Sequence, residues 1–487
     1  MPFRCDAIPV ATPATAAAAV ELLPAPDPWK VARWLSDLPH LLFLDSAATD
    51  HPRGRYSYVA AAPHNICRGP APAAADELFS SQRAVLASFR LTPIPGLPPF
   101  QGGIAGLFGY GLHRSLERIA PCRFDEFAVP DFATAVYPWV VSFDHRQQRA
   151  WLVATGFPAT GPARADHARQ QLQQVLQWLR SSTPPHQPGA SPTTQGIVAA
   201  SDLCPQFPLP HSRGVTSNFR RDDYEATIRR AVDYIHAGDC FQVNLAQRLL
   251  APLRDDPLRL YDRLRQRNPA PFAAYFDLGD FQILSASPER FLRLHPHGEV
   301  ETRPIKGTRP RGRTPEAETT LLRDLTTNPK DRAENVMIVD LLRNDLGKVC
   351  VWGSVRVPVV CEVESFRFVH HLVSEVRGQL RPGLGPLDLL VAAFPGGSVT
   401  GAPKVRAMEI IAELEPTARG PYCGCLGWIG FDAAMDTNIL IRTFTAGRGW
   451  LQFPVGGGIV ADSDPAREYD ETLHKAAGLL QSLSPAE

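Results

Sequence analysis

Residues 455–480 read VGGGIVADSDPAREYDETLHKAAGLL, and this stretch predicts a strand that passes through a glycine-rich turn into a helix. Asp464 suits the N-cap of that helix and Pro465 its first turn, because aspartate accepts free backbone N–H groups and proline lacks one. The three glycines Gly456, Gly457 and Gly458 permit close approach of a ligand to the backbone. A plain strand-to-helix turn is the other interpretation.

The rest of the chain repeats this mixture of strands and helices. Apolar residues at helical spacing predict helices over 222–237 and 331–345, whereas AAYFDLG (273–279) and FQILSAS (281–287) fit a pair of neighbouring strands. NILIRTFTAG (438–447) also reads as a strand. Because strands pair locally and helices come in groups, we expect an α+β fold.

Composition and periodicity divide the chain into four parts. They are an Ala/Pro-rich N-terminal extension (1–38), a strand-rich N-terminal region closed by a helix (39–180), a flexible linker (181–215) and a C-terminal region of alternating helices and strands (216–482).

The charge balance excludes some classes of function. Lys and Arg total 50 and Asp and Glu total 50, so the formal net charge is zero. A nucleic-acid binder needs a cationic face and a membrane-surface protein a polybasic patch, so neither is expected. No apolar run reaches the length that spans a bilayer.

The nine cysteines are scattered and odd in number, which does not fit a disulfide framework. We therefore expect reduced thiols and a cytoplasmic location. The N-terminal residues lack the continuous apolar segment of a secretory signal, and an organellar address stays open.

Acidic side chains recur on two predicted helices. Glu468, Glu471 and Lys475 share one face of the last helix, which fits either a solvated stripe or a divalent-metal and anion site. Glu334 lies on an apolar helix face, where a carboxylate must be paired, protonated or metal-bound. Arg343 is a candidate partner for it.

Three further side chains suggest chemistry. Lys306 stands between a proline-stiffened strand end and a glycine, and a lysine in a partly desolvated site can act as a nucleophile. Glu289 follows Pro288 at a predicted strand end. Arg442 lies on an otherwise apolar strand, where arginine usually binds a carboxylate. With the acids and the glycine turn, these residues suggest magnesium and a small polycarboxylate substrate.

The motifs occur in one order that resembles the chorismate-utilising enzymes, the family of the anthranilate and aminodeoxychorismate synthase large subunits and of the isochorismate and salicylate synthases. The resemblance is strong over 222–480 and looser over 40–155. It rests on SASPERF (285–291), RPIKGTRPRG (303–312), DRAENVMIVDLLRNDLGKV (331–349), FPGGSVTGAPKVRAMEII (394–411), DTNILIRTF (436–444) and GGGIVADSDPAREYDETLHKA (456–476). It implies antiparallel sheets sandwiched with helices outside, an N-terminal region like that of anthranilate synthase component I, and a C-terminal chorismate-binding domain.

Two positions sort the members of the family. Isochorismate and salicylate synthases carry a water-activating lysine where this chain has Gln242. Anthranilate synthases usually read PIAGT where this chain has Lys306. A lysine at that position marks the aminodeoxychorismate synthase type, which feeds para-aminobenzoate and folate synthesis, so the resemblance implies amination of chorismate at C4. The alternative is an anthranilate synthase component I, which aminates C2 and eliminates pyruvate.

The resemblance also implies how substrate and metal are held. Mg²⁺ would bridge Glu334 and Glu471, with Glu468 near by, to the ring carboxylate of chorismate. The carboxylates of the substrate would be held by Arg442, by Lys475 and by the backbone N–H groups around Gly457 and Gly458.

Reaction roles are implied in the same way. Glu289 matches the general acid that protonates the departing C4 hydroxyl, and Lys306 the nucleophile that adds at C2, for which its pKa must be depressed. His371 matches the histidine beside the ring. Ser398 and Thr400 match the loop that closes over the substrate.

A partner and an effector follow from the resemblance. The chain shows no glutaminase cysteine, so ammonia would come from a separate glutamine amidotransferase subunit. FLDSAA (43–48) with RGRYSY (53–58) matches a tryptophan effector site, with Ser46 as contact, and equally fits an ordinary strand and turn. A catalytically silent subunit would have lost Glu289, Glu334, Glu471 or Arg442, and all four are present.

Overall fold

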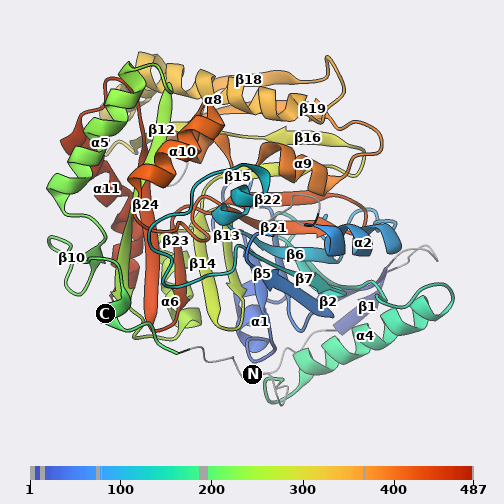
Figure 1. Ribbon diagram of the computed structural model, residues 1–487. Coiled ribbons are helices and arrows are strands. Elements are labelled where there is room, and N and C mark those ends of the chain that lie inside the picture. The colour runs from blue at the N-terminus through green and yellow to red at the C-terminus, as the bar shows by residue number, and fades with distance from the viewer. Residues whose placement is uncertain are drawn as a thin grey trace.

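Two antiparallel sheets lie one over the other, with helices covering their outer faces (Figure 1). The computed structural model describes residues 6–10, 17–72, 77, 79–185, 196–365 and 369–484. Within these residues the larger sheet has 14 strands and the smaller has 10. The arrangement confirms the expected α+β fold of sandwiched sheets with helices outside.

The larger sheet contains, in chain order, β1 (Asp6–Pro9), β2 (Ala18–Leu23), β3 (Leu42–Asp45), β4 (Tyr56–Ala60), β8 (Trp139–Asp144), β9 (Arg149–Ala154), β10 (Phe207–Pro208), β11 (Thr216–Ser217), β12 (Gln242–Pro252), β13 (Phe272–Asp277), β14 (Phe281–Ser287), β20 (Gly401–Ala402), β23 (Thr443–Gly447) and β24 (Trp450–Ile459). The smaller sheet contains β5 (Asn65–Gly69), β6 (Gly103–Phe108), β7 (Phe132–Tyr137), β15 (Arg290–Leu294), β16 (Glu299–Thr302), β17 (Ile305–Pro310), β18 (Arg356–Ser365), β19 (Val369–Gln379), β21 (Cys425–Gly430) and β22 (Met435–Ile439).

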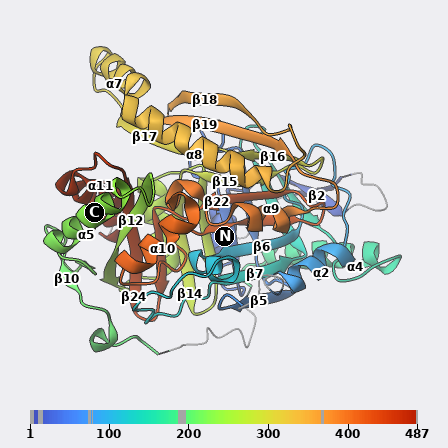
Figure 2. The same ribbon diagram turned by 45° about the horizontal axis from the view of Figure 1, so that its top comes forward.

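The helices of the described residues are α1 (Pro28–Trp34), α2 (Ser80–Ser88), α3 (His113–Leu116), α4 (Ala163–Arg180), α5 (Arg221–His236), α6 (Pro257–Arg267), α7 (Pro315–Thr327), α8 (Pro329–Gly347), α9 (Pro386–Ala393), α10 (Lys404–Leu414) and α11 (Pro465–Leu483). The helices α8 and α11, which were expected to carry acids, cover different sheets. α8 packs on β17 and β19, whereas α11 packs on β24 beside α5 (Figure 2).

The core has layers that follow the two-residue period of the strands. Buried residues on one face of the larger sheet, such as Phe43 and Leu152, pack against α1, α4, α6 and α11. Residues on its other face, such as Tyr58 and Phe276, pack against the smaller sheet. Both faces of the larger sheet are therefore buried, because side chains alternate across a strand.

Both sheets contain strands from both halves of the chain. In the larger sheet β3 pairs with β13, as Phe43 opposite Tyr275 shows, and in the smaller sheet β6 pairs with β21, as Ala105 opposite Trp428 shows. The expected N-terminal extension (1–38) also contributes to the larger sheet, since its strand β2 pairs with β9. The centre of the expected linker, 186–195, lies outside the described residues.

One expected strand is in fact two. The segment 438–447 belongs to β22 of the smaller sheet up to Ile439 and to β23 of the larger sheet from Thr443. Between them the backbone of Arg442 is left-handed, with φ 51°. The expectation that Arg442 lies on a strand is therefore wrong, because the chain passes from one sheet to the other at this residue.

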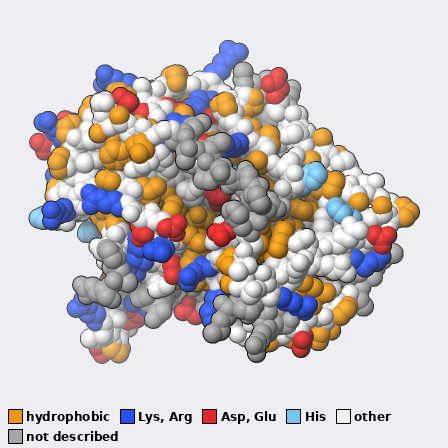
Figure 3. Space-filling model, turned by 90° about the horizontal axis from the view of Figure 1, so that it is seen from below, with side chains coloured by type: hydrophobic (Ala, Val, Ile, Leu, Met, Phe, Trp, Pro, Cys, Tyr) orange, Lys and Arg blue, Asp and Glu red, His pale blue; other side chains and the backbone are white. Residues whose placement is uncertain are grey.

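The surface agrees with the zero net charge. On the face in Figure 3, acidic and basic side chains are interspersed with apolar ones. Within the part of the chain that the structure describes, no helix combines the length and apolar character needed to cross a membrane.

Candidate active site

Two of the predicted site residues, Glu289 and Arg442, lie where the chain passes between the two sheets. Glu289 joins β14 of the larger sheet to β15 of the smaller one, and Arg442 makes the reverse passage from β22 to β23. The two passages are tied together, since Ile439 donates its N–H to the carbonyl of Glu289 at 3.0 Å and Ala286 to that of Arg442 at 3.1 Å. The passages bring an acid and a cation to one place.

Gly457 on β24 is surrounded by charged side chains of α11. A Cβ added at Gly457 would lie 3.3 Å from Oε2 of Glu468, 3.6 Å from Nζ of Lys475 and 3.8 Å from Oε1 of Glu471. The absence of a side chain therefore leaves the space into which all three charged groups point. Asp464 caps the helix as expected, accepting the N–H of Arg467 at 2.9 Å.

Gly458 brings the two sheets together. A Cβ added there would lie 3.0 Å from Nε2 of Gln242 on β12 and 3.3 Å from Nζ of Lys306 on β17. Lys306 belongs to the smaller sheet and the other two residues to the larger sheet. The lysine of the smaller sheet therefore lies beside the glycine strand of the larger sheet, next to Gln242.

Lys306 lies in a β-bulge. Ile305 pairs with Val373 and Thr308 with His371, so two residues of β17 stand opposite the single Leu372. Burial lowers the pKa of Lys306; the negative charge of Glu334 opposes this effect and the positive charge of Lys475 adds to it. The structure thus gives Lys306 the depressed pKa that a nucleophilic amine requires.

Glu289 is buried and hydrogen-bonded. The hydroxyl of Ser398, in the loop before β20, donates to its Oε1 at 2.8 Å. Burial raises the pKa of Glu289 to about 7, against the lowering effects of Ser398 and Lys306. A carboxylic acid that keeps its proton near neutral pH can act as a general acid. Thr400, in the same loop, is fully buried and donates to the carbonyl of Gly396 at 3.0 Å.

The three predicted metal ligands are carboxylates of two helices. Burial raises the pKa of Glu334 and of Glu468. Burial also opposes ionisation of Glu471, but Lys475, 2.7 Å away, outweighs it and holds the pKa of Glu471 low. Arg343 pairs with Asp340 instead of Glu334, so that expected partner is wrong. Among the described residues Glu334 has no ion-pair or hydrogen-bond partner.

These carboxylates fit Mg²⁺ by chemistry. The described residues contain no group of three or more His, Cys, Asp or Glu side chains arranged to hold a metal by themselves. Mg²⁺ in proteins is commonly held by one or two carboxylates, with water and substrate oxygens completing its shell. Glu334, whose carboxylate has no ion-pair or hydrogen-bond partner in the described part of the chain, and the acids beside Gly457 are suited to that role.

Arg442 and His371 lie near enough to each other to interact electrostatically. Burial lowers the pKa of the Arg442 guanidinium, which Glu289 partly restores, and its side chain makes no hydrogen bond within the described residues. His371 on β19 is buried, and its Nδ1 lies 2.8 Å from Oγ1 of Thr308. Burial lowers the pKa of His371 to about 3, and Arg442 adds to that effect.

Two buried side chains on β12 have polar atoms without a hydrogen-bond partner among the described residues. Within the described residues, neither Oε1 nor Nε2 of Gln242 has a hydrogen bond, although the side chain is fully buried, and Oδ1 of Asn244 has none. Such atoms normally meet water or a ligand, because leaving them unsatisfied costs about 1–3 kcal/mol each. Asn244 was missed from the sequence, although its spacing of two from Gln242 places it on the same strand face.

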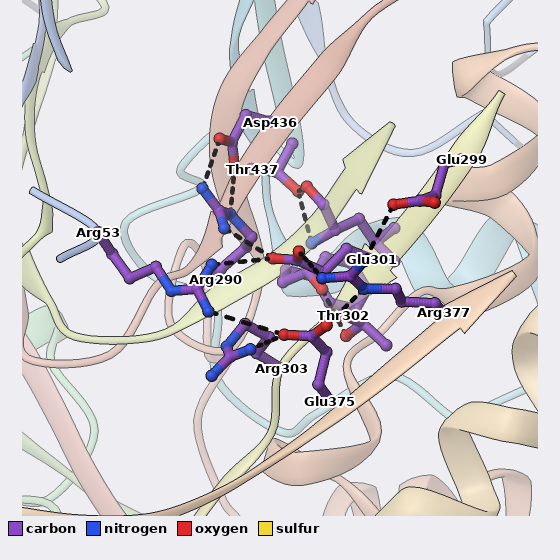
Figure 4. Close-up of polar contacts among 12 residues, drawn as sticks. Arg53, Arg290, Glu299, Glu301, Thr302, Arg303, Glu375, Arg377, Asp436 and Thr437 are labelled. Atoms are coloured by element: carbon purple, nitrogen blue, oxygen red, sulfur yellow. Dashed lines mark hydrogen bonds and ion pairs between the residues drawn. The ribbon is translucent and has the colours of Figure 1, made fainter. Parts of the chain in front are cut away.

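A cluster of arginines and acids lies on β15, β16, β19 and β22, next to Glu289 in the chain (Figure 4). Arg290, one residue after Glu289, contacts Glu301 at 2.9 Å and Asp436 at 2.9 Å. Arg53, from the loop after β3, lies 3.6 Å from Glu301. Buried charges require paired neighbours, so the cluster fixes β15, β16 and β22 relative to the N-terminal loop. Sequence reasoning did not identify it, because its members are far apart in the chain.

Ser46 lies beside this cluster, because Arg53, Arg290 and Asp436 line the same cavity. It lines a cavity of about 270 Å³ between the sheets, together with Tyr56 and Trp428. Its hydroxyl donates to the carbonyl of Tyr56 at 2.6 Å, so the protein already satisfies it. Effector binding there stays a prediction.

Comparison with known proteins identifies the family. The family model described as "chorismate binding enzyme" matches residues 42–481. The chain belongs to this family. The resemblance drawn from the motifs is therefore confirmed, and the family model spans both halves of the chain, as do the two sheets.

Members of the chorismate binding enzyme family with two different names are similar to this chain. Aminodeoxychorismate synthase component 1 of Klebsiella aerogenes is 42% identical over 463 residues, covering 92% of this chain and 95% of that protein. Anthranilate synthase component 1 of Thermus thermophilus is 43% identical over 394 residues, covering 81% of this chain and 80% of that protein.

A solved structure agrees with the fold. The crystal structure of anthranilate synthase component I from Streptococcus pneumoniae TIGR4 matches with a TM-score of 0.73 and 31% sequence identity, covering 88% of this chain and 92% of that chain.

Proposed function

We propose that this chain is an aminodeoxychorismate synthase component 1, which converts chorismate and ammonia to 4-amino-4-deoxychorismate for para-aminobenzoate and folate synthesis. The observation that carries this proposal is Lys306. Its Nζ reaches the glycine strand at Gly458 and its pKa is depressed, as an attacking amine requires. Identity to the two kinds of relative is nearly equal, but the aminodeoxychorismate synthase relative is matched over more of this chain, 92% against 81%. Lys306 adds a chemical reason for the same choice.

The proposed reaction has two displacements. The amine of Lys306 adds at C2 of the ring, the ring double bonds shift, and the C4 hydroxyl leaves as water with the proton of Glu289. Ammonia then adds at C4, the double bonds shift back, and the lysine leaves C2. Glu289 supplies the proton that hydroxide, a poor leaving group, requires. The enolpyruvyl group stays on the ring throughout.

Anionic groups of the substrate need cationic partners. We assign them to Arg442, Lys475 and the backbone N–H groups at Gly457 and Gly458. Glu334, Glu471 and Glu468 would hold Mg²⁺, which when bound neutralises the ring carboxylate of chorismate. The raised pKa of Glu334 and the absence of a protein partner for it among the described residues support this assignment.

Ammonia is assigned to a separate glutamine amidotransferase subunit, and the reaction to the cytoplasm. The relatives are named component 1 of a synthase, which supports a partner subunit.

Product identification tests the proposal. The purified chain is incubated with chorismate, Mg²⁺ and an ammonium salt at alkaline pH, and the product is identified by mass. A product with an amino group in place of the hydroxyl and the enolpyruvyl group intact supports the proposal. Fluorescent anthranilate with released pyruvate contradicts it and establishes the anthranilate synthase reaction.

Two variants sharpen the test. Lys306→Ala is expected to form no aminodeoxychorismate, whereas Lys348→Ala, which removes a half-exposed lysine paired with Asp345 on α8, should match the wild type.

Removal of metal by EDTA is expected to abolish product formation, and added Mg²⁺ to restore it. Full activity in EDTA contradicts the metal assignment alone.

A further inference from the structure

The orientation of Lys306 depends on the bulge that it occupies. In a regular ladder each residue of β17 has one partner on β19, but Lys306 and Gly307 share the single partner Leu372. A bulge bends its strand and redirects the side chain next to the extra residue. Gly307 has φ 84°, a left-handed conformation, and a Cβ there would lie 3.0 Å from Leu325.

His371 contacts the bulge at two points. Thr308, the first regularly paired residue after it, lies opposite His371, and its Oγ1 is 2.8 Å from Nδ1 of the ring. The ring also hydrogen-bonds to the backbone of Gly307. The imidazole of His371 thus contacts both Gly307 in the bulge and Thr308 after it, the two residues that follow Lys306.

The surroundings of His371 favour a neutral ring. It is 2% exposed, and the groups that act on it are the cations and histidines Arg442, His51 and His370. Burial beside a cation holds its pKa near 3, so the ring does not gain or lose a proton near neutral pH. A ring that keeps one charge state can hold hydrogen bonds of fixed polarity.

We propose that His371 is a positioning residue that fixes the bulge at Lys306 and Gly307 through Thr308, and so aims the lysine amine at the substrate. This inference rests on the proposed function, because it needs Lys306 to react. An amine displaced by about 1 Å from its attack position loses about a hundredfold in rate.

Thr308→Val tests this role without removing a buried side chain. Thr308 is exposed, and valine fits a strand, so the variant is expected to fold. Its kcat with ammonia should fall about 10- to 100-fold, with KM for chorismate within about threefold of wild type. Thr308→Ser keeps the hydroxyl and should recover most of the lost kcat.

Ser365→Ala is the matched control. Ser365 on β18 makes the same contact with the neighbouring histidine, since its Oγ lies 2.8 Å from Nδ1 of His370. The other ring nitrogen of His370 pairs with Glu318 of α7. This variant should keep wild-type kcat. The shape of the pH–rate profile should be the same in all three variants.

The outcomes separate the inference from the proposed function. Normal kcat in Thr308→Val, or an equal loss in Ser365→Ala, overturns the positioning role. If a limb of the pH–rate profile moves in Thr308→Val, His371 acts as an acid or base in the reaction. That result also overturns the positioning role. The proposed function instead fails if the wild type forms anthranilate or if Lys306→Ala keeps its activity, whatever Thr308→Val does.

Discussion

At the scale of single residues, the site holds an acid and an amine whose charges are both suppressed. Glu289 has its pKa raised to about 7 by burial, and burial lowers that of Lys306. In the proposed reaction each group acts in its neutral form, Glu289 as a proton donor and Lys306 as a nucleophile. The same desolvation therefore prepares both for opposite roles.

We predict that the pH profile of kcat/KM for chorismate has a limb set by Glu289, with a change of slope at about pH 7. Glu289 donates a proton only while protonated and its pKa is about 7, so above that pH its loss of the proton offsets any gain from deprotonation of Lys306. The measurement is the rate from pH 6 to 9 with the concentration of free NH3 held constant. A profile that is flat across this range contradicts the assignment of Glu289 as general acid.

Ser398→Ala should move this limb to higher pH. The Ser398 hydroxyl bonds to the Glu289 carboxyl at 2.8 Å and lowers its pKa, so its loss leaves the effect of burial less opposed. The variant is compared with wild type in the same profile. A limb that stays in place would show that the hydroxyl does not interact with the ionised carboxylate.

At the scale of elements, we expect neighbouring glycines of β24 to have different roles, Gly456 in stability and Gly458 in activity. The glycines of β24 are adjacent, yet a Cβ would meet different atoms at each. At Gly456 it would lie 2.3 Å from the backbone oxygen of Leu245, whereas at Gly458 its nearest neighbours are the ends of the Gln242 and Lys306 side chains. Backbone cannot move aside cheaply, but long side chains can.

We therefore predict opposite phenotypes for two neighbouring substitutions. Gly456→Ala should lower the free energy of unfolding by about 1–3 kcal/mol, because it forces β12 and β24 apart. Gly458→Ala should keep wild-type stability but lose at least about tenfold in kcat, because it displaces the lysine amine. Denaturant unfolding and ammonia-dependent kinetics measure the two effects. Equal stability of both variants, or full activity of Gly458→Ala, would contradict this view of β24.

At the scale of the whole molecule, the catalytic half depends on the N-terminal half for its sheets. Strand β13 has β3 as a neighbour and β21 has β6, so removal of the N-terminal half would leave two long strand edges unpaired. It would also expose apolar residues such as Phe276 and Trp428 that pack between the sheets. Arg53 would be lost from the ion-pair cluster behind Glu289.

We predict that residues 216–482 expressed alone do not fold cooperatively. Unpaired, apolar strand edges promote aggregation, and the core between the sheets would be incomplete. Thermal unfolding followed by circular dichroism measures this, with the full chain as control. A cooperative transition with ammonia-dependent activity in the fragment would show that the catalytic half is an independent domain.

Sequence alone identified the chemistry and the elements with strong local signals. Helix α11 begins after Asp464 as predicted, and Glu468, Glu471 and Lys475 point at the glycine strand. These signals come from residues a few positions apart, whose spacing fixes a shared face or a cap. The ordered motifs also fixed the family and the choice of Lys306 as the deciding residue.

Tertiary structure alone decided where these groups meet. The passage of the chain between sheets at Arg442, the contact of Lys306 with Gly458 and the bulge held by His371 all depend on strands far apart in the chain. Local periodicity describes the faces of a strand but not its partner, its register or its sheet, because those are set by long-range pairing and by the packing of the whole core.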